Sequence, residues 1–113
     1  MTPEILHHFG GGVYAKETHI PAGLILVQHK HNYDHLSILA SGTVVLDVDG
    51  VQSELTGPQC LTIKAGIHHG VRAVTDVHWY CIHSAHVDDE AALFMNDEKN
   101  EDAEMVIQRL REI

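Results

Sequence analysis

Between residues 12 and 84 the chain consists of short apolar runs, rich in β-branched residues, that are separated by turn signals. Runs of this composition are typical of β-strands. The pattern predicts eight strands, over residues 12–19, 24–31, 35–40, 43–48, 51–55, 60–64, 69–74 and 77–84. The strongest turn signal is Asp49-Gly50, which fits a two-residue type I′ hairpin between VVLDV and VQSEL. Many short strands with frequent turns predict a sandwich or barrel rather than βαβ units.

The pattern changes after His86. A short acidic and apolar stretch over residues 88–94 fits one helical turn, and residues 96–102 form a polar connection. Five apolar residues then recur at helical spacing: Ala103, Val106, Ile107, Leu110 and Ile113. They predict a helix over residues 100–113, with Asn100 as a cap and Arg109 and Arg111 in its last turn, where cations suit the helix dipole.

These patterns predict one β-barrel domain over residues 1–87 and an acidic helical extension over residues 88–113. A chain of 113 residues provides one modest core and is too short for two. We expect the helical extension to pack on the barrel or on a partner subunit, because one of its faces is apolar.

The formal charge of −9 is acidic in both parts of the chain, which argues against nucleic acid and against an anionic membrane surface as partners. No apolar run is long enough to cross a bilayer, and the first residues do not resemble a secretory leader. We therefore expect a cytoplasmic protein. The two cysteines, Cys60 and Cys81, lie in strand-like contexts and are expected to be buried and reduced.

Eleven histidines are the outlier in the composition. Three of them, His29, His31 and His35, fall within the stretch GLILVQHKHNYDHLSILASG, residues 23–42. Residues two apart in a strand share a face, so His29 and His31 are expected to point to the interior together with Ile25 and Val27. After the turn at residues 32–34, His35 can return to the same pocket from the next strand.

His69 begins another apolar strand and supplies a fourth candidate imidazole. Four imidazoles in one apolar interior are costly unless their nitrogens find partners. A divalent metal removes that cost, because neutral imidazole is a good ligand for first-row metals. His68 is the alternative to His69 for the fourth place. His83 shares a strand parity with Trp79 and Cys81, and we expect all three to line the interior.

The residues from Gly23 to Gly42 resemble the first cupin motif, G-x5-H-x-H-x3,4-E-x6-G. Every spacing matches through His29, His31 and His35, and the one change of type is His35 in the place of the usual glutamate. The second motif, G-x5-P-x-G-x2-H-x3-N, is matched more loosely. Gly57 is followed by one extra residue, and the later positions are Lys64 for the proline, Gly66, His69 and Ala73 for the asparagine.

The resemblance covers about residues 12 to 84 and implies an all-β fold, a cupin-type jelly-roll barrel, here with a short C-terminal α-helical tail. It also implies one mononuclear metal site whose ligands are His29, His31, His35 and His69. The metal is one divalent transition metal, with Fe, Mn, Ni, Cu and Zn all open. Histidine in place of glutamate removes one negative charge, which favours a stronger Lewis acid and an anionic bidentate substrate.

Three functions follow from the resemblance as hypotheses, because a fold does not define a reaction. The first is a small-molecule enzyme of the dioxygenase or oxidoreductase type that acts on a chelating substrate. A metal-dependent isomerase or lyase is a second version of the enzyme. The alternative class is a cupin without turnover, serving as a metal or ligand sensor or as a structural module.

The expected partners are a small-molecule substrate or ligand and a second copy of the chain in a homodimer. Leu24, Leu26, Leu36 and Ile38 are expected on the outer face of the barrel, opposite the histidines. An apolar outer face of this kind is typical of a subunit interface.

Overall fold

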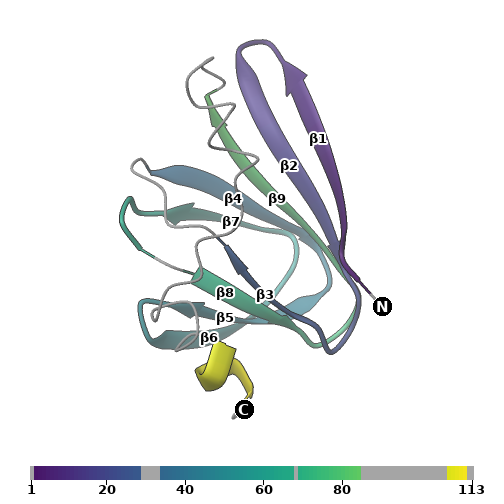
Figure 1. Ribbon diagram of the computed structural model, residues 1–113, viewed down its shortest axis with the longest axis vertical. Coiled ribbons are helices and arrows are strands. Elements are labelled where there is room, and N and C mark those ends of the chain that lie inside the picture. The colour runs from purple at the N-terminus through teal and green to yellow at the C-terminus, as the bar shows by residue number, and fades with distance from the viewer. Residues whose placement is uncertain (1, 29–33, 68, 85–106, 112–113) are drawn as a thin grey trace.

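The computed structural model describes residues 2–28, 34–67, 69–84 and 107–111. The described residues form nine strands in two antiparallel sheets that face each other (Figure 1). The strands are β1 (Glu4–Gly10), β2 (Val13–Ile20), β3 (Ile25–Gln28), β4 (His35–Ser41), β5 (Thr43–Val48), β6 (Val51–Thr56), β7 (Gln59–Ile63), β8 (His69–Ala73) and β9 (Val77–Ser84). All eight strands predicted from the sequence are present, with ends shifted by a few residues.

The strand order is β1-β2-β9-β4-β7 in one sheet and β3-β8-β5-β6 in the other. Strands that neighbour each other in space are mostly distant in the chain, which is the arrangement of a jelly roll. The predicted fold class is therefore confirmed. The core lies between the sheets and is formed by Ile20, Leu39, Val44, Leu46, Val71, Ala73, Val77, Trp79 and Cys81.

Strand β4 shows the alternation that separates the two faces of the first sheet. His35, Ser37 and Leu39 are buried, whereas Leu36 between them is 40% exposed. Leu36 and Ile38 therefore lie on the outer face, as the sequence predicted.

Strand β3 has the opposite parity from the predicted one. Leu26 pairs with the core residue Val71, and both Leu24 and Leu26 pack against the core, so they do not lie on the outer face. Ile25, which was expected to face inward, pairs with Arg72 on the other side of the sheet. The prediction failed because residues 24–27 are apolar at every position, and alternation then gives no parity.

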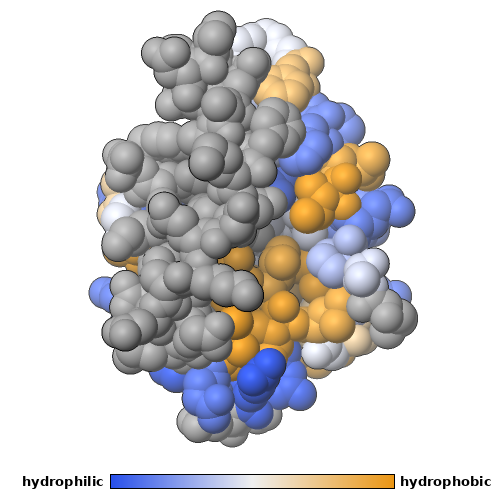
Figure 2. Space-filling model, viewed as in Figure 1, coloured by the Kyte–Doolittle hydropathy of each residue, from blue (hydrophilic) through white to orange (hydrophobic). Residues whose placement is uncertain are grey.

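Hydrophobic residues also gather on the face seen in Figure 2, in the lower middle of the view where Figure 1 places β3 and β8. This agrees with a strand that is apolar on both sides. A strand of this type is typical of a sheet that is covered on both faces.

Strand β1 was missed by the sequence analysis. It pairs with β2 through a hairpin whose Gly11 and Gly12 have φ angles of 59° and 76°, which favour glycine. All seven of its residues are exposed, and Phe9 is 48% exposed. The three consecutive glycines at residues 10–12 are the signal that could have revealed this hairpin.

Three of the predicted turn and motif residues have clear structural reasons. Asp49 and Gly50 have φ angles of 50° and 85°, the pair of positive values that a type I′ hairpin requires. Gly42, the last glycine of the first motif, has a φ of 95°, and a Cβ at this position would collide with the backbone oxygen of Asp76. Only glycine allows the turn after β4 to approach the turn before β9 this closely.

The described part of the predicted C-terminal helix, residues 107–111, is helical and lies beside the four-stranded sheet (Figure 1). Leu110 is fully buried, and the Arg109 guanidinium donates hydrogen bonds of 2.9 Å and 3.0 Å to the carboxylate of Asp47. Asp47 is itself fully buried and also accepts bonds from the Gln52 amide and the Gly50 N–H. Residues 100–106 and 112–113 of the predicted helix, the predicted turn at 88–94, and the boundary at 87 lie outside the described residues.

The electrostatics of Asp47 indicate what the helix contributes. Burial alone raises the pKa of this carboxyl, but the hydrogen bonds from Arg109, Gln52 and Gly50 outweigh burial and hold the pKa below its usual value. The ionised carboxylate in β5 therefore depends on the helix for one of its partners.

No helix among the described residues is long and apolar enough to cross a membrane.

We expect Arg109→Met to lower the free energy of unfolding by about 2–5 kcal/mol, because it leaves a buried carboxylate without its cation. The neighbouring Arg111→Met is the matched control, since Arg111 is exposed and its loss should cost under about 0.5 kcal/mol. Urea denaturation followed by circular dichroism measures both. Equal effects of the two substitutions would contradict the coupling.

Candidate metal centre

The barrel interior holds a compact group of metal-binding side chains. Of the residues that the structure describes, one group of three His, Cys, Asp or Glu residues has its ligand atoms within 4.8 Å of one another: His35, His69 and Cys81. These residues are 5%, 0% and 6% exposed. The His35 and His69 rings lie 5.5 Å apart between centroids, at an angle of 41°.

The group joins the two sheets. His35 is the first residue of β4, and Cys81 lies on β9, where its Cα is opposite Ser37 of β4. His69 is the first residue of β8 and comes from the other sheet, where it is opposite Val48 of β5. Trp79 lies fully buried beside the group, with its ring centroid 6.3 Å from that of His69. The strand pairing fixes each donor within its own sheet, and the packing of the two sheets brings the donors together.

Burial sets the protonation of these donors. It lowers the pKa of His35 to about 4, with the nearby His83 acting in the same direction and Asp34 against it. His35 is therefore neutral at pH 7, which is the form that binds a metal. Burial raises the pKa of the Cys81 thiol, so the thiol is protonated until another group removes its proton. Imidazole nitrogens beside a thiol form a donor set that fits a first-row divalent metal.

The predicted ligands are placed unequally by the structure. His35 and His69 come together in the interior, from strands far apart in the sequence. His29 and His31 lie outside the described residues, as does His68, the alternative to His69. The four-histidine ligand set therefore stays a prediction.

The structure also places the two cysteines. Cys81 lies within the metal-binding group, whereas the sequence indicated only a plain lining of the core; its shared parity with Trp79 and His83 was the available signal. Both cysteines are free, but Cys60 is exposed on β7, so the expectation that both would be buried is wrong for Cys60. The reason is again strand parity: Cys60 pairs with the outward-facing Ile38.

A row of side chains crosses the inner face of the first sheet at the level of Cys81. The Cα partners are His7 with Lys16, Lys16 with Cys81, and Cys81 with Ser37. The Ser37 hydroxyl lies 3.7 Å from the Cys81 sulfur. The pKa of Lys16 is lowered by burial, and the nearby Cys81 acts in the opposite direction. One amine thus lies on the same face as the metal-binding group.

A second, aromatic row lies one step closer to the start of β2. Tyr14 is 1% exposed, and its hydroxyl is 2.6 Å from Nδ1 of His7. Its ring packs against His83, with centroids 5.1 Å apart, and against Phe9, with centroids 4.9 Å apart. His83 is also near enough to lower the pKa of His35. The predicted inward orientation of Trp79, Cys81 and His83 agrees with these contacts.

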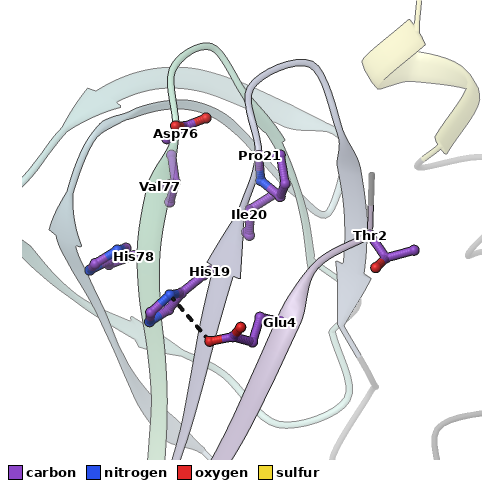
Figure 3. A pocket seen from close by; sticks show the side chains of 8 residues that line it. All are labelled: Thr2, Glu4, His19, Ile20, Pro21, Asp76, Val77 and His78. Carbon is purple, nitrogen blue, oxygen red and sulfur yellow. Dashed lines mark ion pairs between the residues drawn. The ribbon is translucent and has the colours of Figure 1, made fainter.

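A separate pocket of about 330 Å³ lies at the opposite ends of β2 and β9 (Figure 3). It contains His19 and His78, whose rings stack with centroids 4.0 Å apart. Glu4 forms an ion pair with His19 at 3.8 Å. These residues come from the outer face of the sheet and are not part of the interior group.

We expect the metal-free protein to lose stability as the pH falls from about 6.5 to 4. The unfolded chain binds a proton at His35 near pH 6.5, whereas the folded chain resists protonation until about pH 4, so protons favour unfolding in this interval. The contribution is on the order of 2–3 kcal/mol. Thermal unfolding at several pH values measures it. His35→Gln should flatten the curve in this interval relative to the wild type, and parallel curves would contradict the assignment.

A family model for the cupin domain matches residues 16–83. No curated protein matches the sequence. Among solved structures, a cupin superfamily protein of Desulfitobacterium hafniense is 14% identical, covering 75% of this chain and 79% of that one, with a TM-score of 0.65. KdgF of Halomonas is 19% identical, covering 78% and 81%, with a TM-score of 0.62.

Salicylate 1,2-dioxygenase of Pseudoaminobacter salicylatoxidans, in its adduct with gentisate, is 10% identical with a TM-score of 0.69. The match covers 86% of this chain but only 29% of that larger enzyme. At these identities the structural likeness shows the fold alone. The family model spans more than half of the sequence, and with the jelly-roll topology it shows that this chain belongs to the cupin family.

Proposed function

We propose that this cupin is a metal-dependent small-molecule enzyme of the dioxygenase type, acting on a substrate that chelates the metal. The observation that carries the proposal is the buried group of His35, His69 and Cys81 between the two sheets. Perturbed titratable groups within a barrel interior are characteristic of functional sites. A salicylate dioxygenase is among the solved structures that share this fold, and we take its type of chemistry as the reaction to test.

We propose His29, His31, His35 and His69 as the metal ligands. His35 supports this set because it is already neutral at pH 7 and loses little when it binds a cation. Cys81 is proposed as a neighbour of the metal and not as a ligand, because its raised pKa makes the loss of the thiol proton costly.

A bound redox-active metal such as Fe(II) or Mn(II) would supply open coordination positions for a chelating substrate and dioxygen. The protein's own contribution is to hold the donors and to exclude water. Trp79, whose ring lies near that of His69, and its strand partner Leu39 are both fully buried and exclude water from this part of the interior. Dioxygenase chemistry benefits from such a site, since the exclusion of water prevents side reactions. The polar groups on the inner face of β2 are the Tyr14 hydroxyl, which bonds to His7, the Lys16 amine and the Thr18 hydroxyl.

The partners that we propose are a small-molecule substrate and a second copy of the chain. The homodimer is supported by exposed apolar side chains on the outer face of the five-stranded sheet: Leu6, Val13 and Leu36. Exposed apolar side chains on one sheet are typical of a subunit interface.

The ligand set predicts how metal content responds to substitution. We expect alanine at His29, His31, His35 or His69 to lower metal affinity by about tenfold or more, because each loses one donor. Cys81→Ser should retain the metal, and His78→Ala, on the outer face, is the matched control. Elemental analysis after dialysis against a known free metal concentration measures this. Loss of metal in Cys81→Ser, with no loss at His29 and His31, would replace the four-histidine set by His35, His69 and Cys81.

The reaction predicts metal-dependent consumption of dioxygen. With Fe(II) and a diketone such as acetylacetone or a phenol such as gentisate, we expect oxygen uptake at least about a hundredfold above that of free Fe(II). His35→Ala should abolish it. An oxygen electrode measures the rate, and product analysis measures the balance. Tight binding of these compounds without turnover would indicate a sensor, and function that survives metal removal would indicate a structural role.

A further inference from the structure

We propose that Lys16 is the residue that selects the ligand of this site, and that the ligand is a small anion whose carboxylate is bound by the Lys16 ammonium. This inference deepens the proposed function and rests on it for the location of the ligand. It names the substrate class as small carboxylates with a second chelating oxygen.

Lys16 lies at an inward-facing position of β2. Tyr14, Thr18 and Ile20 are each 1% exposed and share its strand parity, so Lys16 belongs to the inward-facing series. Its Cα partner on β9 is Cys81, a member of the metal-binding group. Residues directly opposite in an antiparallel pair present their side chains on the same face. The amine is therefore placed beside the group and away from the outer surface.

The charged residues at inward-facing positions of the strands also favour an anionic ligand. Lys16 is the one Lys or Arg at an inward-facing position of the strands that the structure describes, because Arg72 pairs with Val45 and Ile25 on the outer side. None of the inward-facing positions of these strands holds an Asp or Glu. The strand carboxylates of Glu4, Glu17, Asp47 and Glu54 all face outward. The described strands thus place one cationic side chain and no carboxylate on the inner face of a protein whose formal net charge is −9.

The Lys16 amine is also available to bind an anion. Lys16 is half-buried and forms no ion pair with any described carboxylate. Lys64 differs, because its amine pairs with Asp34 at 3.5 Å on the surface. A partly desolvated ammonium interacts more strongly with an anion than an exposed one does, because water screens less of the field. The bond to a carboxylate is also charge-assisted.

An alternative explanation of Lys16 is a snorkelling side chain whose stem only covers apolar surface. The residues that face Lys16 argue against this explanation. Its Cα partners are His7 and Cys81, and Ser37 follows in the same row, so the row is polar and titratable.

The test compares glycolate with glycolamide, which differ by one charge but keep the hydroxyl and the carbonyl oxygen. Dissociation constants are measured by NMR titration of the full chain, with the metal loaded and with it stripped. The variants are Lys16→Met, which removes the charge, Lys16→Arg, which keeps it, and Lys64→Met, which removes a surface charge. Circular dichroism and elemental analysis on the same samples report folding and metal content.

We expect the wild type to prefer glycolate, and Lys16→Met to reduce the ratio of the two dissociation constants about tenfold or more, with or without metal. Lys16→Arg and Lys64→Met should keep the preference, and metal content should not change. An unchanged ratio in Lys16→Met would overturn the proposal. A lowered ratio together with lost metal would also overturn it, since Lys16 would then act through the metal site. A wild-type protein that binds no metal would contradict the proposed function. The ratio of dissociation constants in the metal-free samples would still test the role of Lys16.

Discussion

Hydrogen bonding of β9 on both of its edges is the constraint on which the rest of the structure depends. β9 pairs with β2 over eight residues and with β4 on its other side, so it is the central strand of the five-stranded sheet. Its alternate residues Val77, Trp79 and Cys81 are all buried. A shift of one residue would turn this whole series outward. The register of β9 therefore holds both the core and the thiol of the metal-binding group.

This constraint explains how a small barrel tolerates a polar interior. Trp79 and Leu39 belong to the apolar core next to the donors, while His35 and His69 are the first residues of their strands. The cost of burying the imidazoles appears as the lowered pKa of His35. On the opposite side of the second sheet, Asp47 and Arg109 solve a similar problem with a paired charge. The interior remains neutral or cationic, and the acidic groups stay outside.

Much of the fold could be predicted from the sequence, because turn residues and strand composition act locally. Asp49-Gly50 and Gly42 are examples in which the backbone needs a positive φ, and the residue type reveals it. The proximity of the His35 and His69 side chains was expected from the spacing of the two motifs. The parity of β3 could not be predicted, since it depends on its pairing with β8 and not on its own pattern. Cys81 was underestimated for the same reason: its neighbours His69 and His35 come from strands distant in the chain.

Strand β1 has a consequence for the behaviour of the protein at high concentration. β1 is an edge of the larger sheet, paired with β2 alone among the described strands, and it carries Ile5, Leu6 and Phe9 at the surface. An open edge of this kind can template the addition of a foreign strand, and such growth leads to aggregates. Between these apolar residues stand His7 and His8. The formal net charge of −9 makes the molecules repel one another at pH 7, so buffers near the sequence pI of about 5.5 should favour this growth.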